Sequence, residues 1–145
     1  MTSDVVASVR IAAPPKAVFD YLVDPDKLIR WMGTEVAIDP RPGGQFRLDV
    51  NGSDVASGEY VEVLESERVS FSWGWEGSPT VPPGSSLVTI DLVEDGTETL
   101  VTLTHADLPV DSRNDHLQGW THYVERLAVA ATGSDPGPDP MVDSA

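Results

Sequence analysis

Residues 111–132 have the sequence DSRNDHLQGWTHYVERLAVAAT. Apolar side chains recur in this stretch every three or four positions and share one side of a helix: Leu117, Trp120, Val124, Leu127, Ala128 and Ala131. The spacing predicts one long helix, with Gly133 as its C-terminal stop. Because such a helix has to bury its apolar stripe, the rest of the chain should supply a matching apolar surface.

The region before this helix, residues 34–105, has the pattern of an antiparallel meander. Short runs of apolar and β-branched residues alternate with turns that contain Gly, Asn, Asp or Pro. They predict strands near 34–39, 44–50, 55–64, 68–76, 86–93 and 98–105. Alternation then assigns three sets of side chains to shared faces: Phe46, Leu48 and Val50; Val69, Phe71, Trp73 and Trp75; and Val101, Leu103 and His105.

Residues 5–31 predict one more strand and two short helices. The strand covers residues 5–12, a helix follows over 16–23, and Asp24 caps a second helix over 25–31. The fold class is therefore α+β: a curved antiparallel sheet of about six to seven strands wrapped around the long C-terminal helix, with two short helices after the first strand.

The length of 145 residues fits a single domain, which we place at residues 1–132. The remaining stretch, residues 133–145, is rich in Pro, Gly and Asp and has almost no apolar surface to bury. It is predicted to be a disordered tail.

Composition excludes several classes of function. The chain has 9 Lys and Arg against 24 Asp and Glu, a net charge of −15, so nucleic acids and anionic membrane surfaces are poor partners. It has no cysteine, which excludes disulfides, thiol catalysis and cysteine-bound metals and fits a reducing compartment. The sequence shows no basic leader with an apolar run and no apolar stretch of about 20 residues. We expect a cytoplasmic protein with no membrane partner.

Six stretches, taken in order, resemble a known family: IAAPPKAVFDYLVDPDKLIRWMG, PGGQFRLDV, GEYVEVLESERVSFSWGWEG, PPGSSLVTIDL, TLVTLTHADLP and HLQGWTHYVERL. The chain is similar over residues 5–132 to the SRPBCC (START and birch-pollen-allergen-like) superfamily. Within it, the chain most resembles the bacterial homologues of the heat-shock-protein ATPase activator C-terminal domain. The Gly119-Trp120 pair and the segment Trp73-Gly74-Trp75 carry most of this likeness.

The resemblance implies a helix-grip fold with an elongated cavity between the sheet and the last helix. Relatives use this cavity for apolar, lipid-like small molecules or, in polyketide cyclases, for chemistry on them. In the eukaryotic namesake the domain acts beside a second domain on a chaperone, for which this chain has no room, so that activity is not transferred on fold alone. Some relatives form homodimers, but no feature of this sequence requires one.

Eight residues are candidates for lining the cavity. The aromatic ones form either a ligand site or ordinary core: Trp31, Phe46, Phe71, Trp73, Trp75, Trp120 and Tyr123. Trp120 is the strongest, since its helix should cover the cavity, and Gly119 beside it could allow a close approach of helix to sheet. His105 would add one polar group, unless it is a structural histidine with satisfied hydrogen bonds.

No cofactor or metal site is predicted. His116 and His122 lie about 240° apart on a helix and cannot chelate a metal together. Nucleophile and phosphate-binding motifs are absent from the sequence. The first hypothesis is therefore non-catalytic binding of a small apolar or aromatic molecule. A second is a cyclase- or hydrolase-type enzyme that uses His105 with Asp49 or Glu59 as acid and base. A third is a chaperone-associated interaction domain, which would need an exposed apolar patch.

Overall fold

The computed structural model describes residues 4–140. Its strands are β1 (Val5–Ile11), β2 (Glu35–Ile38), β3 (Gln45–Asp49), β4 (Val55–Leu64), β5 (Arg68–Trp73), β6 (Ser86–Asp95) and β7 (Glu98–Ala106). They form one seven-stranded antiparallel sheet in the order β1-β7-β6-β5-β4-β3-β2. The meander from β2 to β7 pairs each strand with the next, and β1 closes the other edge beside β7.

The helices are α1 (Pro15–Val23), α2 (Pro25–Leu28), a 3-10 turn η1 (Val110–Ser112) and α3 (Arg113–Ala131). Proline opens both short helices, where its missing N–H costs no hydrogen bond. The Asp24 side chain caps α2 by accepting from the N–H of Asp26, as predicted. This helix ends at Leu28 rather than at residue 31, and hydrogen-bonded turns follow it as far as Trp31.

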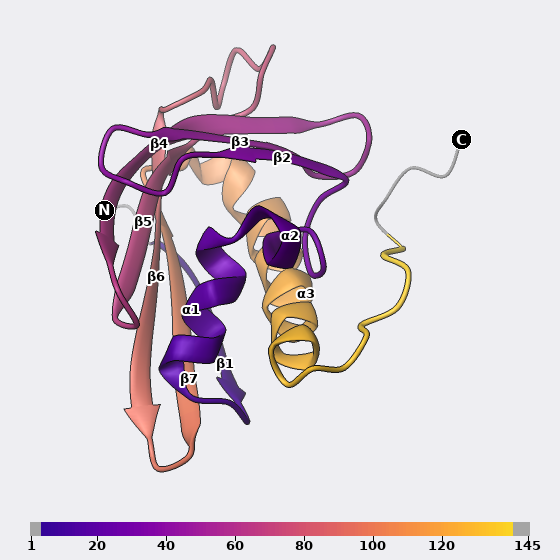
Figure 1. Ribbon diagram of the computed structural model, residues 1–145. Helices are drawn as coiled ribbons and strands as arrows, with labels where there is room; N and C mark the ends of the chain where they lie inside the picture. The colour runs from indigo at the N-terminus through magenta and orange to yellow at the C-terminus, as the bar shows by residue number, and fades with distance from the viewer. Residues whose placement is uncertain (1–3, 141–145) are drawn as a thin grey trace.

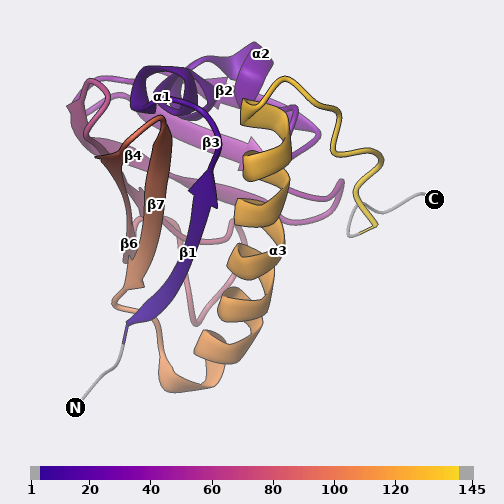
Figure 2. The same cartoon turned by 90° about the horizontal axis from the view of Figure 1, so that it is seen from below.

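The sheet curves around the helices, which all lie on one side of it (Figure 1). Seen from below, α3 runs along β1 and spans the open side of the curved sheet (Figure 2). This is the predicted α+β helix-grip fold. The arrangement leaves the concave face of the sheet and the inner face of α3 to form the interior together.

The predicted faces are confirmed for the central strands. Phe46, Leu48 and Val50 are buried, as are Val69, Phe71 and Trp73, and Val101, Leu103 and His105. Phe46 and Phe71 stack with their ring centroids 4.0 Å apart, and Tyr60 meets both rings edge-on. Each fully buried side chain of this size contributes roughly 1.5–3 kcal/mol relative to exposure, so this aromatic cluster anchors one half of the core.

Two expectations about the sheet and the long helix are wrong. The strand predicted over 68–76 ends at Trp73, because the backbone of Gly74 passes so close to Pro82 that no side chain would fit there. Leu117 does not join the buried stripe and is 40% exposed. His116, four residues before Trp120, lies on the inner face of α3 instead, and both rings contact His105.

Within residues 4–140, no helix is both long and apolar enough to cross a membrane. The same residues contain no group of three or more His, Asp or Glu side chains arranged to hold a metal ion.

Candidate functional site

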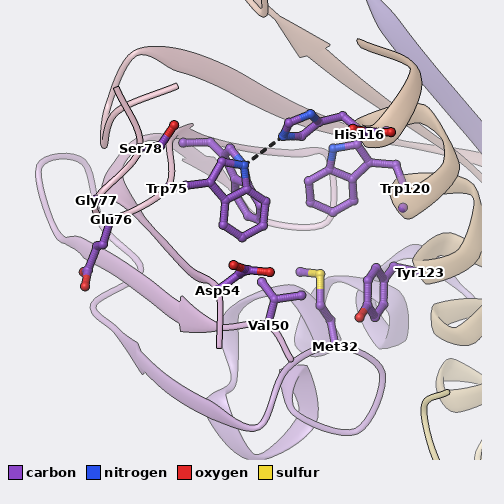
Figure 3. Close-up of a pocket in the computed structure, with 13 residues that line it drawn as sticks. Met32, Val50, Asp54, Trp75, Glu76, Gly77, Ser78, His116, Trp120 and Tyr123 are labelled. Carbon is purple, nitrogen blue, oxygen red and sulfur yellow. Dashed lines mark hydrogen bonds between the residues drawn. The ribbon is translucent and has the colours of Figure 1, made fainter. Parts of the chain in front are cut away.

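A cavity of about 510 Å³ opens between the inner face of α3 and one end of the sheet. Its walls are mainly aromatic and apolar, and its mouth is polar (Figure 3). The lining residues are Met32, Val50, Asp54, Trp73, Trp75, Glu76, Gly77, Ser78, Asp115, His116, Gly119, Trp120 and Tyr123. Both the volume and the mixture of walls are typical of small-molecule sites.

Trp75 reaches the cavity from the segment that follows β5. Its indole N–H donates to Nε2 of His116 at 3.0 Å. Because Nε2 accepts, the proton of a neutral His116 lies on Nδ1, which is 2.7 Å from the carbonyl oxygen of Ser112, one helical turn earlier. These two hydrogen bonds fix Trp75 against the first turn of α3, so the mouth of the cavity has a defined shape.

His105 forms a second chain of hydrogen bonds deeper in the core. The indole N–H of Trp120 donates to its Nδ1 at 2.9 Å, and its Nε2 lies 2.8 Å from Oγ of Ser86, which donates in turn to the carbonyl oxygen of Trp73. The ring is 0% exposed. Burial, together with nearby His116, lowers the pKa of His105 to about 3. His105 is thus a neutral imidazole that holds Trp120 in place.

The structure divides the eight predicted site residues into two groups of four. Trp73, Trp75, Trp120 and Tyr123 line the cavity. The other four lie in the core instead: Trp31, Phe46, Phe71 and His105. The indole N–H of Trp31, for example, donates to the carbonyl oxygen of Tyr21, which ties the turn after α2 to α1.

The acid and base pair considered for an enzyme is not brought together. Asp49 alternates with the buried Phe46 and Leu48 and so lies on the outer face of β3, where it accepts from the N–H of Gly52. Glu59 is exposed on β4. Both nitrogens of His105 are already hydrogen-bonded within the protein, so the geometry does not support His105 acting with either Asp49 or Glu59.

Gly119 has a different role from the expected one. A Cβ added at this position would meet no atom within 4 Å, so the helix does not approach the sheet closely there. The missing side chain leaves open space in the cavity wall instead. The rest of the lining was not among the predicted site residues: Met32, Val50, Asp54, Glu76, Gly77, Ser78, Asp115 and His116. Two of these had a local signal, Val50 through its alternation with Phe46 and Leu48 and His116 through its position one turn before Trp120.

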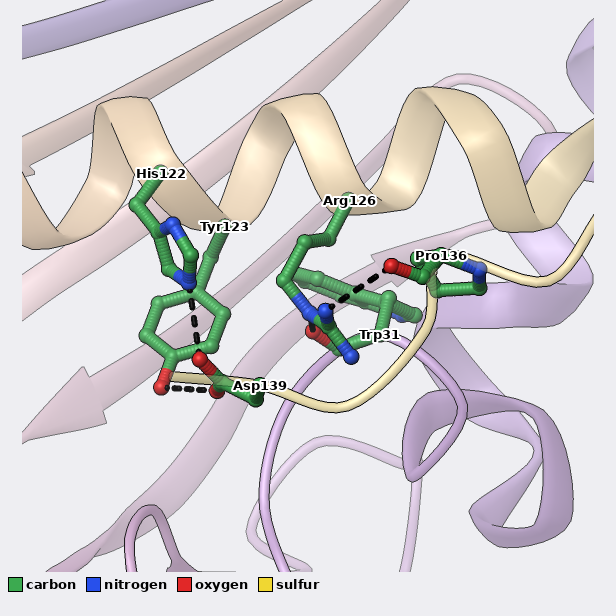
Figure 4. A network of polar contacts seen from close by, with 6 residues as sticks. All are labelled: Trp31, His122, Tyr123, Arg126, Pro136 and Asp139. Carbon is green, nitrogen blue, oxygen red and sulfur yellow. Dashed lines mark hydrogen bonds and ion pairs between the residues drawn. The ribbon is translucent and has the colours of Figure 1, made fainter. Parts of the chain in front are cut away.

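Part of the expected tail lies along α3. The structure describes it as far as residue 140, and residues 141–145 of the predicted disordered stretch lie outside the described residues. Asp139 accepts from the hydroxyl of Tyr123 at 2.7 Å and contacts Nε2 of His122 at 2.9 Å (Figure 4). Arg126 donates to the carbonyl oxygens of Pro136 and Trp31. Burial and the neighbouring Asp139 raise the pKa of Tyr123 above its ordinary value.

We expect these tail contacts to contribute little to stability. Removing residues 134–145 should lower the free energy of unfolding by about 1–2 kcal/mol, since few hydrogen bonds are lost, and the thermal midpoint by about 3–8 °C. The Tyr123 phenol should then ionise at lower pH, because its charged acceptor is gone. Absorbance at 295 nm during an alkaline titration measures this. Asp139→Asn should reproduce the phenol shift, whereas Asp135→Asn should not.

The chain matches the model of a protein family described as Activator of Hsp90 ATPase homolog 1-like protein, over residues 12–132. No curated protein matches it. Among solved structures, an AHSA1-like protein from Rhizobium etli is 47% identical, with a TM-score of 0.73, and the match covers 100% of this chain and 92% of that one.

Two further structures extend the comparison. CalU16 from Micromonospora echinospora is 28% identical, with a TM-score of 0.73 and coverage of 94% of this chain and 87% of that one. The Aha1 dimer from Colwellia psychrerythraea is 17% identical, with a TM-score of 0.78 and coverage of 90% and 96%. At that identity the Colwellia protein shares the fold alone.

Proposed function

The chain belongs to the family of Activator of Hsp90 ATPase homolog 1-like proteins, and on that premise we propose that it binds a small apolar or aromatic molecule in the cavity between the sheet and α3, without chemistry of its own. The observation that carries this proposal is the cavity of about 510 Å³ with Trp73, Trp75, Trp120 and Tyr123 in its walls. Cavities of this size and lining enclose most of the surface of a molecule of two or three rings.

The hydrogen bonds of the two histidines support binding rather than acid–base catalysis by an imidazole. An acid or base has to reach the substrate with a free nitrogen or oxygen. His116, the imidazole in the lining, has Nε2 bonded to Trp75 and Nδ1 bonded to Ser112, and His105 behind it has both nitrogens bonded as well. These groups fix the shape of the walls, which is what a selective binding site requires.

Gly119 allows a test that keeps the fold intact. Gly119→Leu should fill the cavity from the helix side and weaken binding at least about tenfold. It should not destabilise the protein, since leucine is a better helix former than glycine and the added Cβ meets no atom. The measurement is the quenching of tryptophan emission by neutral aromatic compounds such as 1-naphthol and 4-phenylphenol, with the thermal midpoint recorded in parallel.

Gln118→Leu is the matched control, because it adds the same side chain to the exposed face of α3. It should leave binding unchanged. The proposal is wrong if no neutral aromatic compound quenches the wild type saturably, or if Gly119→Leu binds them as tightly as the wild type does.

The family brings two alternatives. A chaperone-associated role would use an exposed apolar patch, and a small one exists where Val6 on β1 lies near Val110 and Leu117. A homodimer has a precedent in the Colwellia Aha1 dimer. We favour the cavity over this patch because the cavity has more aromatic surface and is shaped by the hydrogen bonds described above.

The absence of cysteine fits a cytoplasmic setting.

A further inference from the structure

The charged groups around the cavity are all acidic. Asp54, Glu76 and Asp115 line its mouth, and among the described residues no Lys or Arg lines it. Glu76 is neutralised by Arg47, whose Nε and Nη2 lie 2.9 and 3.2 Å from its carboxylate oxygens. It also points away from the cavity (Figure 3). Two carboxylates, Asp54 and Asp115, therefore determine the charge that a bound molecule meets.

Asp54 is held firmly in this position. The side-chain oxygen of Asn51 accepts from the N–H groups of Ser53 and Asp54, and the carbonyl oxygen of Asp54 accepts from the N–H of Val50. Its carboxylate accepts from the Asn51 amide at 2.9 Å, and in the described part of the chain it has no ion-pair partner. Figure 3 shows this carboxylate turned into the cavity, on the side where Trp75, Val50 and Met32 lie.

The aromatic walls offer ring faces rather than N–H groups. The indole N–H groups of Trp75 and Trp120 are committed to His116 and His105. Indole faces attract cations through their quadrupole, more strongly when water is excluded. The N–H of Trp73 is buried and has no hydrogen-bond partner among the described residues, so it too is not offered to a molecule in the cavity.

We propose that the natural ligand carries a positive charge, as a protonated amine or a quaternary ammonium group, on an apolar body. The apolar body lies against Trp73, Trp120 and Tyr123, and the cationic group lies near the mouth between the Asp54 carboxylate and the face of Trp75. Fatty acids and other anionic amphiphiles are disfavoured by the same carboxylates. This inference rests on the proposed function and adds the charge class of the ligand.

Three probes with one ring system separate charge from shape: 1-naphthylmethylamine, 1-naphthylmethanol and 1-naphthaleneacetic acid. Binding is measured by calorimetric titration at pH 8, where an ordinary imidazole is neutral. We expect the amine to bind about tenfold more tightly than the alcohol, and the acid to bind most weakly. Raising the salt concentration should weaken the amine alone, because salt screens charge at the open mouth.

Asp54→Asn removes the charge while retaining the shape and an oxygen that accepts from Asn51. It should weaken binding of the amine by about three- to tenfold and leave the alcohol unchanged. Glu94→Gln, on the exposed end of β6, removes the same charge far from the cavity and should change neither.

The outcomes distinguish the two proposals. If the alcohol or the acid binds as tightly as the amine, or if Asp54→Asn and Glu94→Gln behave alike, the charge inference is overturned and the apolar cavity stands. If none of the three probes binds at millimolar concentration, the binding function fails for this class of ligand, and the inference about charge fails with it.

Discussion

Replacing Trp120 with alanine should lower the free energy of unfolding by about 3–5 kcal/mol. The side chain is 3% exposed and packs against Trp73 with ring centroids 5.0 Å apart. Its loss creates a void at the junction of α3 and β5, and it also leaves Nδ1 of the buried His105 without its donor. Since domains of this size are stable by only about 5–15 kcal/mol, this is a large fraction of the total.

Chemical denaturation of three variants separates the contributions. Trp120→Phe keeps a ring in place but removes the N–H, so it should cost less than alanine and report mainly the unpaired His105. Leu117→Ala, on the exposed side of the same helix, should change stability by no more than about 0.5 kcal/mol. A cost for Trp120→Ala as small as that for Leu117→Ala would mean that α3 does not close the core at Trp120.

Trp120 should also report on the ligand. Because it borders the cavity, a bound aromatic molecule should change the emission of the wild type and change that of Trp120→Phe much less. A ligand signal that persists undiminished in Trp120→Phe would place the bound molecule elsewhere in the protein.

The fold could be predicted from the sequence because its signals are local. The period of α3, the alternation of Phe46 and Leu48 in β3, and the capping of α2 by Asp24 each depend on neighbours within a few residues. The errors arose where contacts between distant parts of the chain determine the local structure. The strand β5 ends early because the backbone of Pro82 lies against Gly74. The orientation of α3 against the sheet leaves Leu117 exposed and turns His116 toward the cavity.

The site was only half predictable, for the same physical reason. Trp73 on β5 and Trp120 and Tyr123 on α3 were expected to line the space between the sheet and the last helix, because the fold itself creates that space. The mouth, in contrast, forms where the turn carrying Asp54, the segment after Trp75 and the first turn of α3 converge. No spacing within the sequence shows that these three segments meet, so the acidic rim could not be found without the structure.

The hydrogen bonds of His116 and His105 link the cavity to the core. Trp120 and Trp75 each give the indole N–H to an imidazole, and the two imidazole rings meet edge-on with centroids 5.1 Å apart. Fully satisfied polar networks of this kind fix one arrangement of a core. The aromatic walls are thus positioned by the same buried groups that stabilise the fold.

The protein should therefore lose stability as the pH falls from about 6.5 toward 3. The pKa of His105 is about 3 in the folded protein, whereas an exposed histidine has a pKa of about 6.5. Between these values the unfolded chain binds a proton that the folded protein does not, so acid favours unfolding. The full effect is about 3–5 kcal/mol, complete near pH 3 and absent above about pH 7.

His105→Gln isolates this contribution, because glutamine can accept from Trp120 and donate to Ser86 but does not titrate. The variant is expected to be less stable at pH 7, and the informative quantity is the slope of stability against pH. Between pH 6.5 and 4.5 the wild type should lose about 2–3 kcal/mol more than the variant. Both proteins share the fall in net charge and the titration of surface carboxylates, so the difference between their slopes reports position 105. Parallel slopes would show that His105 becomes protonated within the folded protein, and the buried chain from Trp120 to Ser86 would then have to open in mild acid.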